Sequence, residues 1–265
     1  MKKTKVISFA NNKGGSGKTT TVSNVAAVMA SLGKRVLAVD GDMQVNLSLS
    51  YFNEARVFDF AAGNNLYTAV KNGVSGKSLE KFIVKTKYDG LDLFPSSPLL
   101  STVELELYPR KNRELVLKEC LKPIIEGGKY DYVLIDAPPT LGVWVTNILA
   151  ASDFVVVPLE ASPWGLFGLA NMFDIINETK KINPTLEVLG IALTKADERK
   201  NYFKDTLDIL KDNEAARLFK SYIKVDSAIE WAQDNSEPVV AYKRYSRSAL
   251  GYQKLAKEIM EYADR

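Results

Sequence analysis

The residues best suited to chemistry lie near the N-terminus in FANNKGGSGKTT, where glycines, lysines and threonines follow a short apolar run. Gly17, Lys18 and Thr19 match the end of the phosphate-loop pattern G-x-x-x-x-G-K-[ST]. Small residues there let backbone N–H groups at a helix N-terminus face a phosphate. We expect Lys18 to reach the β and γ oxygens of a nucleotide and Thr19 to ligate Mg²⁺. The residues predicted to bind the nucleotide are Lys13, Gly14, Gly15, Ser16, Gly17, Lys18, Thr19 and Thr20.

A second lysine, Lys13, stands five residues before Lys18, and Asn12 replaces the first glycine of the pattern. A lysine at the tip of the loop need not contact the nucleotide of its own chain. It could project outward and meet phosphates that another subunit binds. We therefore count Lys13 with Lys18 among the candidate catalytic residues.

Two further apolar runs end in aspartates. VLAVDGD carries Asp40 and Asp42 at its end, and YDYVLID ends in Asp136. Ligands of open α/β sheets bind at the carboxyl ends of the strands, so these carboxylates should lie near the phosphate loop. Asp136 has the placement of a Walker B carboxylate, which acts on Mg²⁺ through water.

The composition excludes several kinds of site. The chain of 265 residues has no histidine and one cysteine, Cys120, which rules out Ser-His-Asp or Cys-His catalysis, imidazole ligands and an intrachain disulfide framework. The formal net charge is only +3, so a nucleic-acid-binding surface must be a local patch. We find no signal-peptide pattern and no apolar run of membrane-spanning length. A soluble, cytoplasmic protein is the expectation.

The pattern of the whole chain predicts an α/β fold. Continuous Val, Ile and Leu runs typical of strands buried on both faces alternate with segments of helical period. This order predicts a doubly wound, mostly parallel sheet with helices on both faces, as one domain over residues 1–265. Residues 51–98 give no clear assignment. The expected strands are 5–10, 35–40, 131–136, 154–158 and 188–193, and the expected helices are 19–31, 103–125, 141–151, 164–182, 202–212 and 247–263.

These motifs resemble a known family. KGGSGKTT resembles the deviant Walker A motif of the ParA/MinD ATPases, and VLAVDGDMQVNLS resembles their switch I pattern D-x-D-P-Q-x-N. APPTLG is similar to switch II, and the resemblance to ParA/Soj-type partition ATPases covers nearly the whole chain. It implies a homodimer with ATP, in which Lys13 crosses the interface to the partner's ATP.

The same resemblance assigns roles to the switch I residues. It implies that Asp42 orients or activates the attacking water and that Asp40 supports the Mg²⁺ shell. Gln44 and Asn46 would shape the switch. Gly41 and Met43 depart from the family, which usually has an apolar residue and a proline at these positions.

A third segment, ALTKADER, is relevant to which nucleotide base the protein binds. Its T-K-x-D pattern resembles the guanine-reading motif of some GTPases, because an aspartate can accept bonds from two guanine N–H groups. Partition ATPases also keep an aspartate here, so we favour ATP and leave GTP open. The resemblance places the base near Asp197, with Lys224 and Asp226 standing where the family has P-R-N.

The resemblance also suggests partners. It implies nonspecific DNA binding by the dimer, weak Mg²⁺-dependent hydrolysis of ATP, stimulation by a ParB-like centromere-binding protein, and a nucleoid-associated location. No helix-turn-helix domain is expected before the first strand, and no membrane contact. A MinD-like membrane ATPase or a protein-cargo positioning ATPase is the alternative. The candidate DNA-binding residues are Lys195, Arg199, Lys200, Lys204, Lys220, Lys224, Lys243, Arg244 and Arg247.

Overall fold

The computed structural model describes residues 3–74, 76–211 and 216–265. Its centre is a seven-stranded sheet in the order β3-β4-β2-β5-β1-β6-β7. Neighbouring strands are parallel except for the antiparallel pair β3 and β4 at one edge. The mostly parallel sheet expected from the sequence is confirmed. The strands are β1 (Lys5–Phe9), β2 (Val36–Asp40), β3 (Val84–Lys85), β4 (Leu91–Phe94), β5 (Tyr132–Asp136), β6 (Phe154–Glu160) and β7 (Glu187–Thr194).

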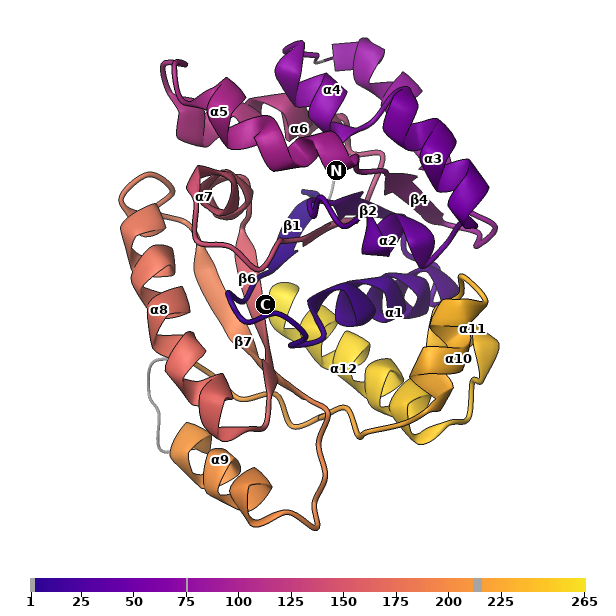
Figure 1. Cartoon of the computed structure of the whole chain (residues 1–265), viewed down its shortest axis with the longest axis vertical. Helices are drawn as coiled ribbons and strands as arrows, with labels where there is room; N and C mark the ends of the chain where they lie inside the picture. Colours follow the sequence, from indigo (N-terminus) through magenta and orange to yellow (C-terminus); the bar gives the residue numbers. More distant parts are fainter. Residues whose placement is uncertain (1–2, 75, 212–215) are drawn as a thin grey trace.

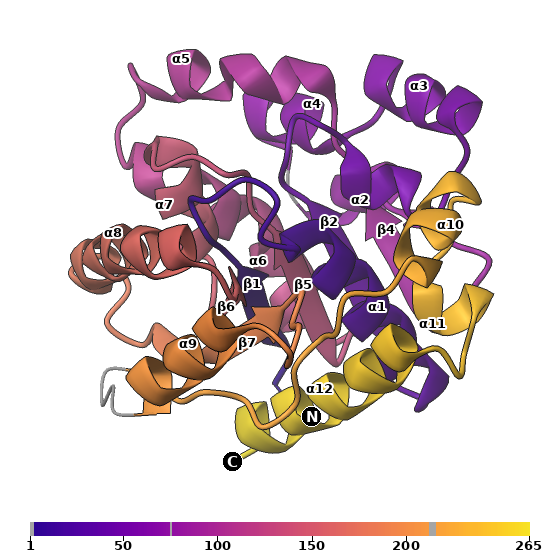
Figure 2. The ribbon, with the colours of Figure 1, turned by 60° about the horizontal axis from the view of Figure 1, so that its bottom comes forward.

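Helices cover both faces of the sheet (Figure 1). On one face α1 (Lys18–Ser31) and α12 (Arg247–Ala263) pack side by side, together with α10 (Ala228–Asp234) and α11 (Val239–Tyr242). Figure 2 shows this face and the long α12 beneath α1. Apolar side chains alternate between the two faces, because successive residues of a strand point to opposite sides.

The other face carries the remaining long helices. Ile7 and Phe9 of β1 enter the core under α1 and α12, whereas Val6 enters the core on the opposite side. The doubly wound fold class is confirmed. The helices of this second side are α4 (Leu66–Lys71), α5 (Val103–Leu107), α6 (Val116–Gly127), α7 (Val143–Ala150), α8 (Pro163–Lys180) and α9 (Asn201–Lys211).

One expected helix is wrong. Residues 103–125 form two helices, α5 and α6, separated by a turn that includes a short 3₁₀ segment, Arg113–Leu115. Pro109 has no N–H with which to continue α5, and Asn112 adopts the left-handed conformation, with φ of 53°. Apolar residues at helical spacing lie on both sides of this turn, and the sequence therefore predicts one helix.

In the stretch 51–98, which the sequence left unassigned, side-chain caps define the starts of two helices. Asn53 accepts a hydrogen bond from the backbone of Arg56 at the start of α3 (Glu54–Ala62), and Asn65 forms a capping box with Thr68 at the start of α4. The strand β4 lies beside β2 in parallel register. The remaining short elements are α2 (Asn46–Leu49) and the 3₁₀ segments Gly76–Phe82 and Pro98–Thr102.

The strand order brings several loops to one edge of the sheet. β1, β2, β5 and β7 all run in the same direction, so the residues that follow Phe9, Asp40, Asp136 and Thr194 leave the sheet at its carboxyl edge. Within the described ranges, no helix is both long and apolar enough to cross a membrane.

Candidate active site

The phosphate loop joins β1 to α1 and requires glycine at two points. Gly15 and Gly17 have φ values of 74° and 83°, a left-handed conformation that side chains with a Cβ rarely adopt. Gly17 precedes α1 and brings no side chain to cap it. The first N–H groups of α1 therefore face the loop, an arrangement that suits an anion.

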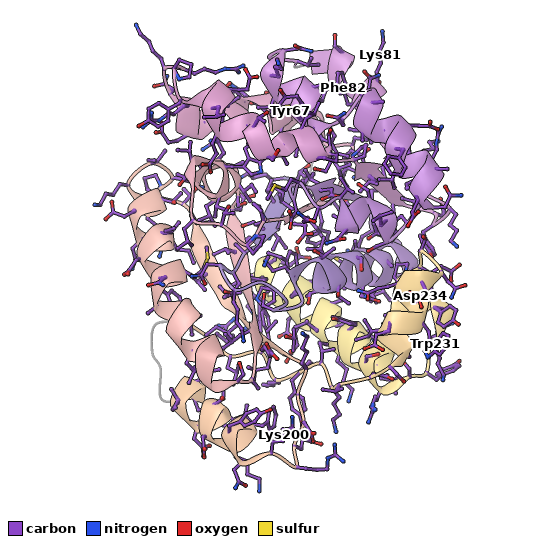
Figure 3. All side chains as sticks on the ribbon, in the orientation of Figure 1. Tyr67, Lys81, Phe82, Lys200, Trp231 and Asp234 are labelled. Atoms are coloured by element: carbon purple, nitrogen blue, oxygen red, sulfur yellow. The ribbon has the colours of Figure 1, made fainter. Side chains whose placement is uncertain are left out.

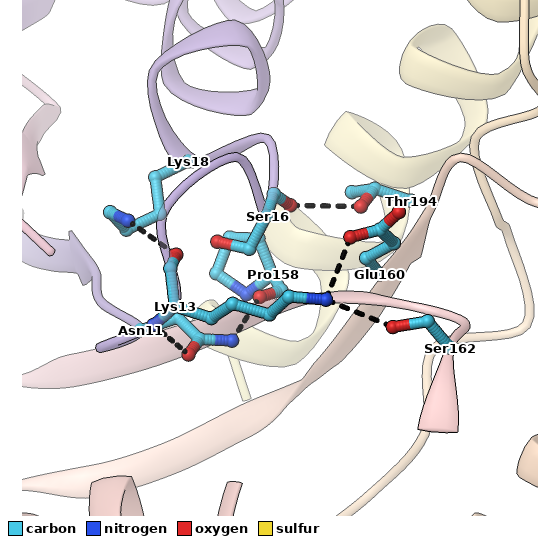
Figure 4. Close-up of polar contacts among 8 residues, drawn as sticks. All are labelled: Asn11, Lys13, Ser16, Lys18, Pro158, Glu160, Ser162 and Thr194. Atoms are coloured by element: carbon cyan, nitrogen blue, oxygen red, sulfur yellow. Dashed lines mark hydrogen bonds and ion pairs between the residues drawn. The ribbon is translucent and has the colours of Figure 1, made fainter. Parts of the chain in front are cut away.

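Lys18 folds back onto the loop. Its side chain is buried, and its Nζ donates to the carbonyl oxygen of Lys13 at 3.2 Å (Figure 4). Burial lowers the pKa of Lys18, while the charges of Asp136 and Asp42 oppose that shift. A phosphate in the loop would offer this ammonium a stronger acceptor than a carbonyl oxygen.

Lys13 is held within its own chain. Its Nζ lies 2.9 Å from the carboxylate of Glu160 and donates to the hydroxyl of Ser162 at 2.9 Å (Figure 4). The backbone N–H of Lys13 donates to Asn11, whose amide in turn donates to the carbonyl of Pro158. The loop tip is thus tied to the end of β6, and a role for Lys13 in another chain requires these contacts to break.

The carboxylate of Asp136 fits a place in a divalent-cation site. The Thr19 hydroxyl donates to its Oδ2 at 2.6 Å, and its Oδ1 is buried without a hydrogen-bond partner in the described part of the chain. Burial, and then the nearby Asp40, raises the pKa of Asp136 well above its usual value. A cation would remove both the unmet acceptor and the unfavourable charge.

The surroundings suit a Mg²⁺ ion that is coordinated by oxygens of both the protein and a phosphate. Among the described residues, no three His, Cys, Asp or Glu side chains come together as a ready metal site. Mg²⁺ is usually held by one or two carboxylates with water and substrate phosphates. Thr19 and Asp136 would supply the protein ligands, and a nucleotide the rest.

Asp40 anchors the segment that follows β2. Its Oδ2 accepts hydrogen bonds from the N–H and the hydroxyl of Ser48 at 2.8 and 2.6 Å, and its Oδ1 accepts from the N–H of Asp42 at 3.3 Å. Burial raises the pKa of Asp40 to about 7 despite these bonds. The sequence did not point to Ser48, which lies within α2. The expected support of the Mg²⁺ shell by Asp40 stays a prediction.

The turn after Asp40 is tight and strained. Asp42 is buried and its Oδ1 accepts from the N–H of Gln44, while Gln44 and Asn46 are exposed. Val45 has a φ of 52°, which is unusual for a β-branched residue and stores strain. This strain lies in the segment predicted to be switch I.

A contact across the sheet edge explains Gly41. A Cβ on Gly41 would lie 2.5 Å from the carbonyl oxygen of Asp136, so a larger residue would force β2 and β5 apart. The indole of Trp144 donates to the carbonyl of Gly41 at 2.8 Å, and the N–H of Trp144 donates to Glu104. Trp144 and Glu104 thereby join the two predicted switches to α5, a link that the sequence did not suggest.

The turn after β7 packs against the phosphate loop. Thr194 donates to the carbonyl of Ser16 at 2.8 Å. Lys195 adopts a φ of 51°, and its Nζ lies 3.7 Å from the position that a Cβ would take on Gly15. This candidate DNA-binding lysine therefore lies against the loop.

The other residues expected near the base are engaged with protein groups. Asp197 is paired with Arg199. The Lys224 ammonium lies 2.6 Å from Glu198. Asp226 accepts from the N–H of Ala228 and from both the N–H and hydroxyl of Ser248, so it links the starts of α10 and α12. Base contacts by Lys224 and Asp226 stay predictions.

The candidate DNA-binding residues differ in how free their charges are. Arg247 lies 4.0 Å from Asp226, whereas Lys243 and Arg244 are exposed with no carboxylate within 4.0 Å among the described residues. Lys200 lies beside α9, at the opposite end of the molecule from Tyr67 (Figure 3). Lys204 and Lys220 are exposed as well.

Comparisons with known proteins agree with this geometry. The family model described as "AAA domain" matches residues 4–188. The chain is 33% identical to the sporulation initiation inhibitor protein Soj of Bacillus subtilis, over 96% of this chain and 98% of Soj. It is 32% identical to the chromosome partitioning protein ParA of Caulobacter vibrioides, over 97% of this chain and 94% of that protein.

A solved structure extends the likeness. Cobyrinic acid a,c-diamide synthase from Mycobacterium smegmatis, solved with ADP and magnesium, has a TM-score of 0.79 and 30% identity, covering 96% of this chain and 93% of that one. The fold and site define a P-loop nucleotide hydrolase. The chain belongs to the AAA-domain family and, within it, to the ParA/Soj-type partition ATPases.

Proposed function

We propose that this chain is an ATP-dependent dimerising switch for the segregation of DNA. Two chains, each a single domain over residues 1–265, enclose two ATP molecules with Mg²⁺ and hold nonspecific DNA on the nucleoid in the cytoplasm. A ParB-like partner accelerates a slow hydrolysis of ATP, which dissolves the dimer. The observation that carries this proposal is the glycine loop at the start of α1, with buried Lys18 and the Thr19–Asp136 pair beside it.

The phosphate end of ATP is bound by the loop. The N–H groups of residues 14–20 and the ammonium of Lys18 contact the phosphates, and Lys18 leaves the carbonyl of Lys13 to do so. Thr19 and Asp136 would hold Mg²⁺, and the bound ion would supply positive charge beside the phosphates. Asp42 is buried beside this site and orients the attacking water.

The dimer depends on Lys13. In a single chain Glu160 and Ser162 hold its ammonium. In the dimer the same ammonium contacts the phosphates of the partner's ATP, where a charge-assisted bond replaces the contact within the chain. ATP thus shifts the population from monomer to dimer, and hydrolysis returns it.

The DNA surface is centred on the start of α12. Lys243 and Arg244 are exposed there with uncompensated charge among the described residues, and Arg247 begins the helix. Basic side chains along phosphates give binding without sequence readout. Arg199 and Lys224 contribute less, because Asp197 and Glu198 compensate their charges.

The test uses Asp42→Ala protein, which should bind ATP without turning it over. We would measure its retention on random-sequence duplex DNA and on anionic liposomes with ATP, ADP or no nucleotide. Retention on DNA with ATP alone supports the proposal. Retention on liposomes favours a membrane-positioning ATPase, and retention on neither favours a protein cargo; either result overturns the DNA proposal.

A further inference from the structure

The carboxylate of Asp197 is occupied by a neighbour two residues along the chain. The N–H and Nε of Arg199 donate to its Oδ1 at 3.2 and 2.8 Å, and Nη2 donates to its Oδ2 at 2.9 Å. The guanidinium lowers the pKa of Asp197 to about 2. Asp197 is therefore charged at neutral pH, with a fork of N–H groups across both oxygens.

The location of this pair matters because its turn borders the phosphate loop. Thr194 bonds to Ser16, and Lys195 lies over Gly15. The backbone of Ala196 is tied to the 223–225 segment by two hydrogen bonds, at 2.8 and 3.2 Å. A nucleotide with its phosphates in the loop would have this turn within reach of its sugar and base.

The two purines present different groups to such a wall. Guanine carries adjacent N–H donors on N1 and N2, whereas adenine carries an acceptor at N1 and a donor on N6. An ionised carboxylate only accepts, so a free Asp197 would suit guanine. With Arg199 in place, the guanine donors would face a guanidinium that also donates, and would be left unpaired.

We propose that Arg199 is a specificity-determining residue, which occupies Asp197 and thereby disfavours guanine nucleotides at the site. The proposal rests on the nucleotide site proposed above. The T-K-x-D motif alone is compatible with binding of either ATP or GTP. Arg199, two residues after its aspartate, is the residue that would distinguish the two bases. The side chain of Arg199 is 89% exposed and that of Asp197 17% exposed, so truncating the arginine uncovers the carboxylate without opening the core.

The experiment measures the affinities of Mg²⁺-ADP and Mg²⁺-GDP by calorimetry, since neither is hydrolysed. The unchanged chain should prefer ADP. Arg199→Ala should shift the GDP-to-ADP affinity ratio toward GDP by about two- to fivefold, the scale of a solvent-exposed ion pair. The double variant Arg199→Ala with Asp197→Asn should lose that gain. Lys211→Ala removes an exposed charge at the far end of α9 and should leave the ratio unchanged.

The outcomes separate this inference from the proposed function. If the unchanged chain binds neither nucleotide, the phosphate-loop site itself fails and the inference fails with it. If it binds ADP but Arg199→Ala leaves the ratio unchanged, the inference alone is overturned. The same holds if the unchanged chain binds GDP as tightly as ADP, or if the double variant keeps the gain.

Discussion

Replacing Glu160 with glutamine should strengthen the ATP-dependent dimer. The substitution keeps the size of the side chain and removes the charge that holds Lys13 at 2.9 Å. In the proposed dimer each Lys13 must leave its own Glu160 to reach the partner's nucleotide. Whatever free energy this contact contributes in the monomer therefore opposes association twice.

The magnitude follows from the exposure of the pair. Lys13 and Glu160 have side chains 26% and 28% exposed, so the contact is partly screened by solvent and is worth about 0.5–1 kcal/mol. Two such contacts amount to about 1–2 kcal/mol, and about 1.4 kcal/mol corresponds to a tenfold change in an equilibrium constant. We expect the dissociation constant of the dimer to fall about 5- to 30-fold.

Sedimentation equilibrium with Mg²⁺ and a non-hydrolysable ATP analogue would measure this constant. Glu178→Gln is the matched control, because it removes a solvent-exposed ion pair between Glu178 of α8 and Lys181, the residue after the helix, and should leave association unchanged. Lys13→Ala should keep nucleotide binding but lose the dimer. A dimer of equal or lower stability in Glu160→Gln would refute the idea that Glu160 restrains Lys13 in the monomer.

Four other changes give further tests. Lys18→Ala should weaken ATP binding at least about tenfold, because a charge-assisted bond to phosphate is lost; normal affinity by calorimetry would refute the phosphate-loop assignment. Val45→Gly should stabilise the nucleotide-free chain by about 1 kcal/mol in denaturant unfolding, since relief of left-handed strain exceeds the added flexibility; a loss of stability would contradict this. Asp40 has its pKa raised by burial to about 7, so the folded state binds its proton more tightly than the unfolded state, and stability without nucleotide or Mg²⁺ should fall as pH rises toward 7. Asp40→Asn should reduce this dependence of stability on pH, and an unchanged dependence would argue against Asp40 as its source. Arg244→Glu should weaken DNA retention and its salt dependence. Lys257→Glu makes a charge reversal of the same sign at an exposed position further along α12 and should not weaken retention. Equal losses would remove Arg244 from the proposed surface.

The sequence was sufficient for the parts of the site that are continuous along the chain. The phosphate loop, α1 and the aspartates at the ends of β2 and β5 follow from glycine spacing and from apolar runs that end in acids. Each of these signals is local, and the parallel sheet brings them to one edge. The same reasoning identified α12 with its observed bounds, Arg247–Ala263.

Contacts between distant segments were beyond that reasoning. Lys13 meets Glu160 because β1 pairs directly with β6, an order that no local pattern specifies. The bond from Trp144 to Gly41 joins residues about a hundred positions apart. The strand β4 was missed because it is short and its place beside β2 depends on the fold around it.

The central claim is that ATP, acting through Lys13, converts monomer to dimer. Multi-angle light scattering of Asp42→Ala protein with Mg²⁺ and ATP, ADP or no nucleotide tests it most directly, with the Lys13→Ala/Asp42→Ala double variant beside it. The account predicts twice the monomer mass of 29.4 kDa with ATP alone, and a monomer for the double variant in every condition. A monomer with ATP, or a dimer that forms without regard to nucleotide or Lys13, would contradict it.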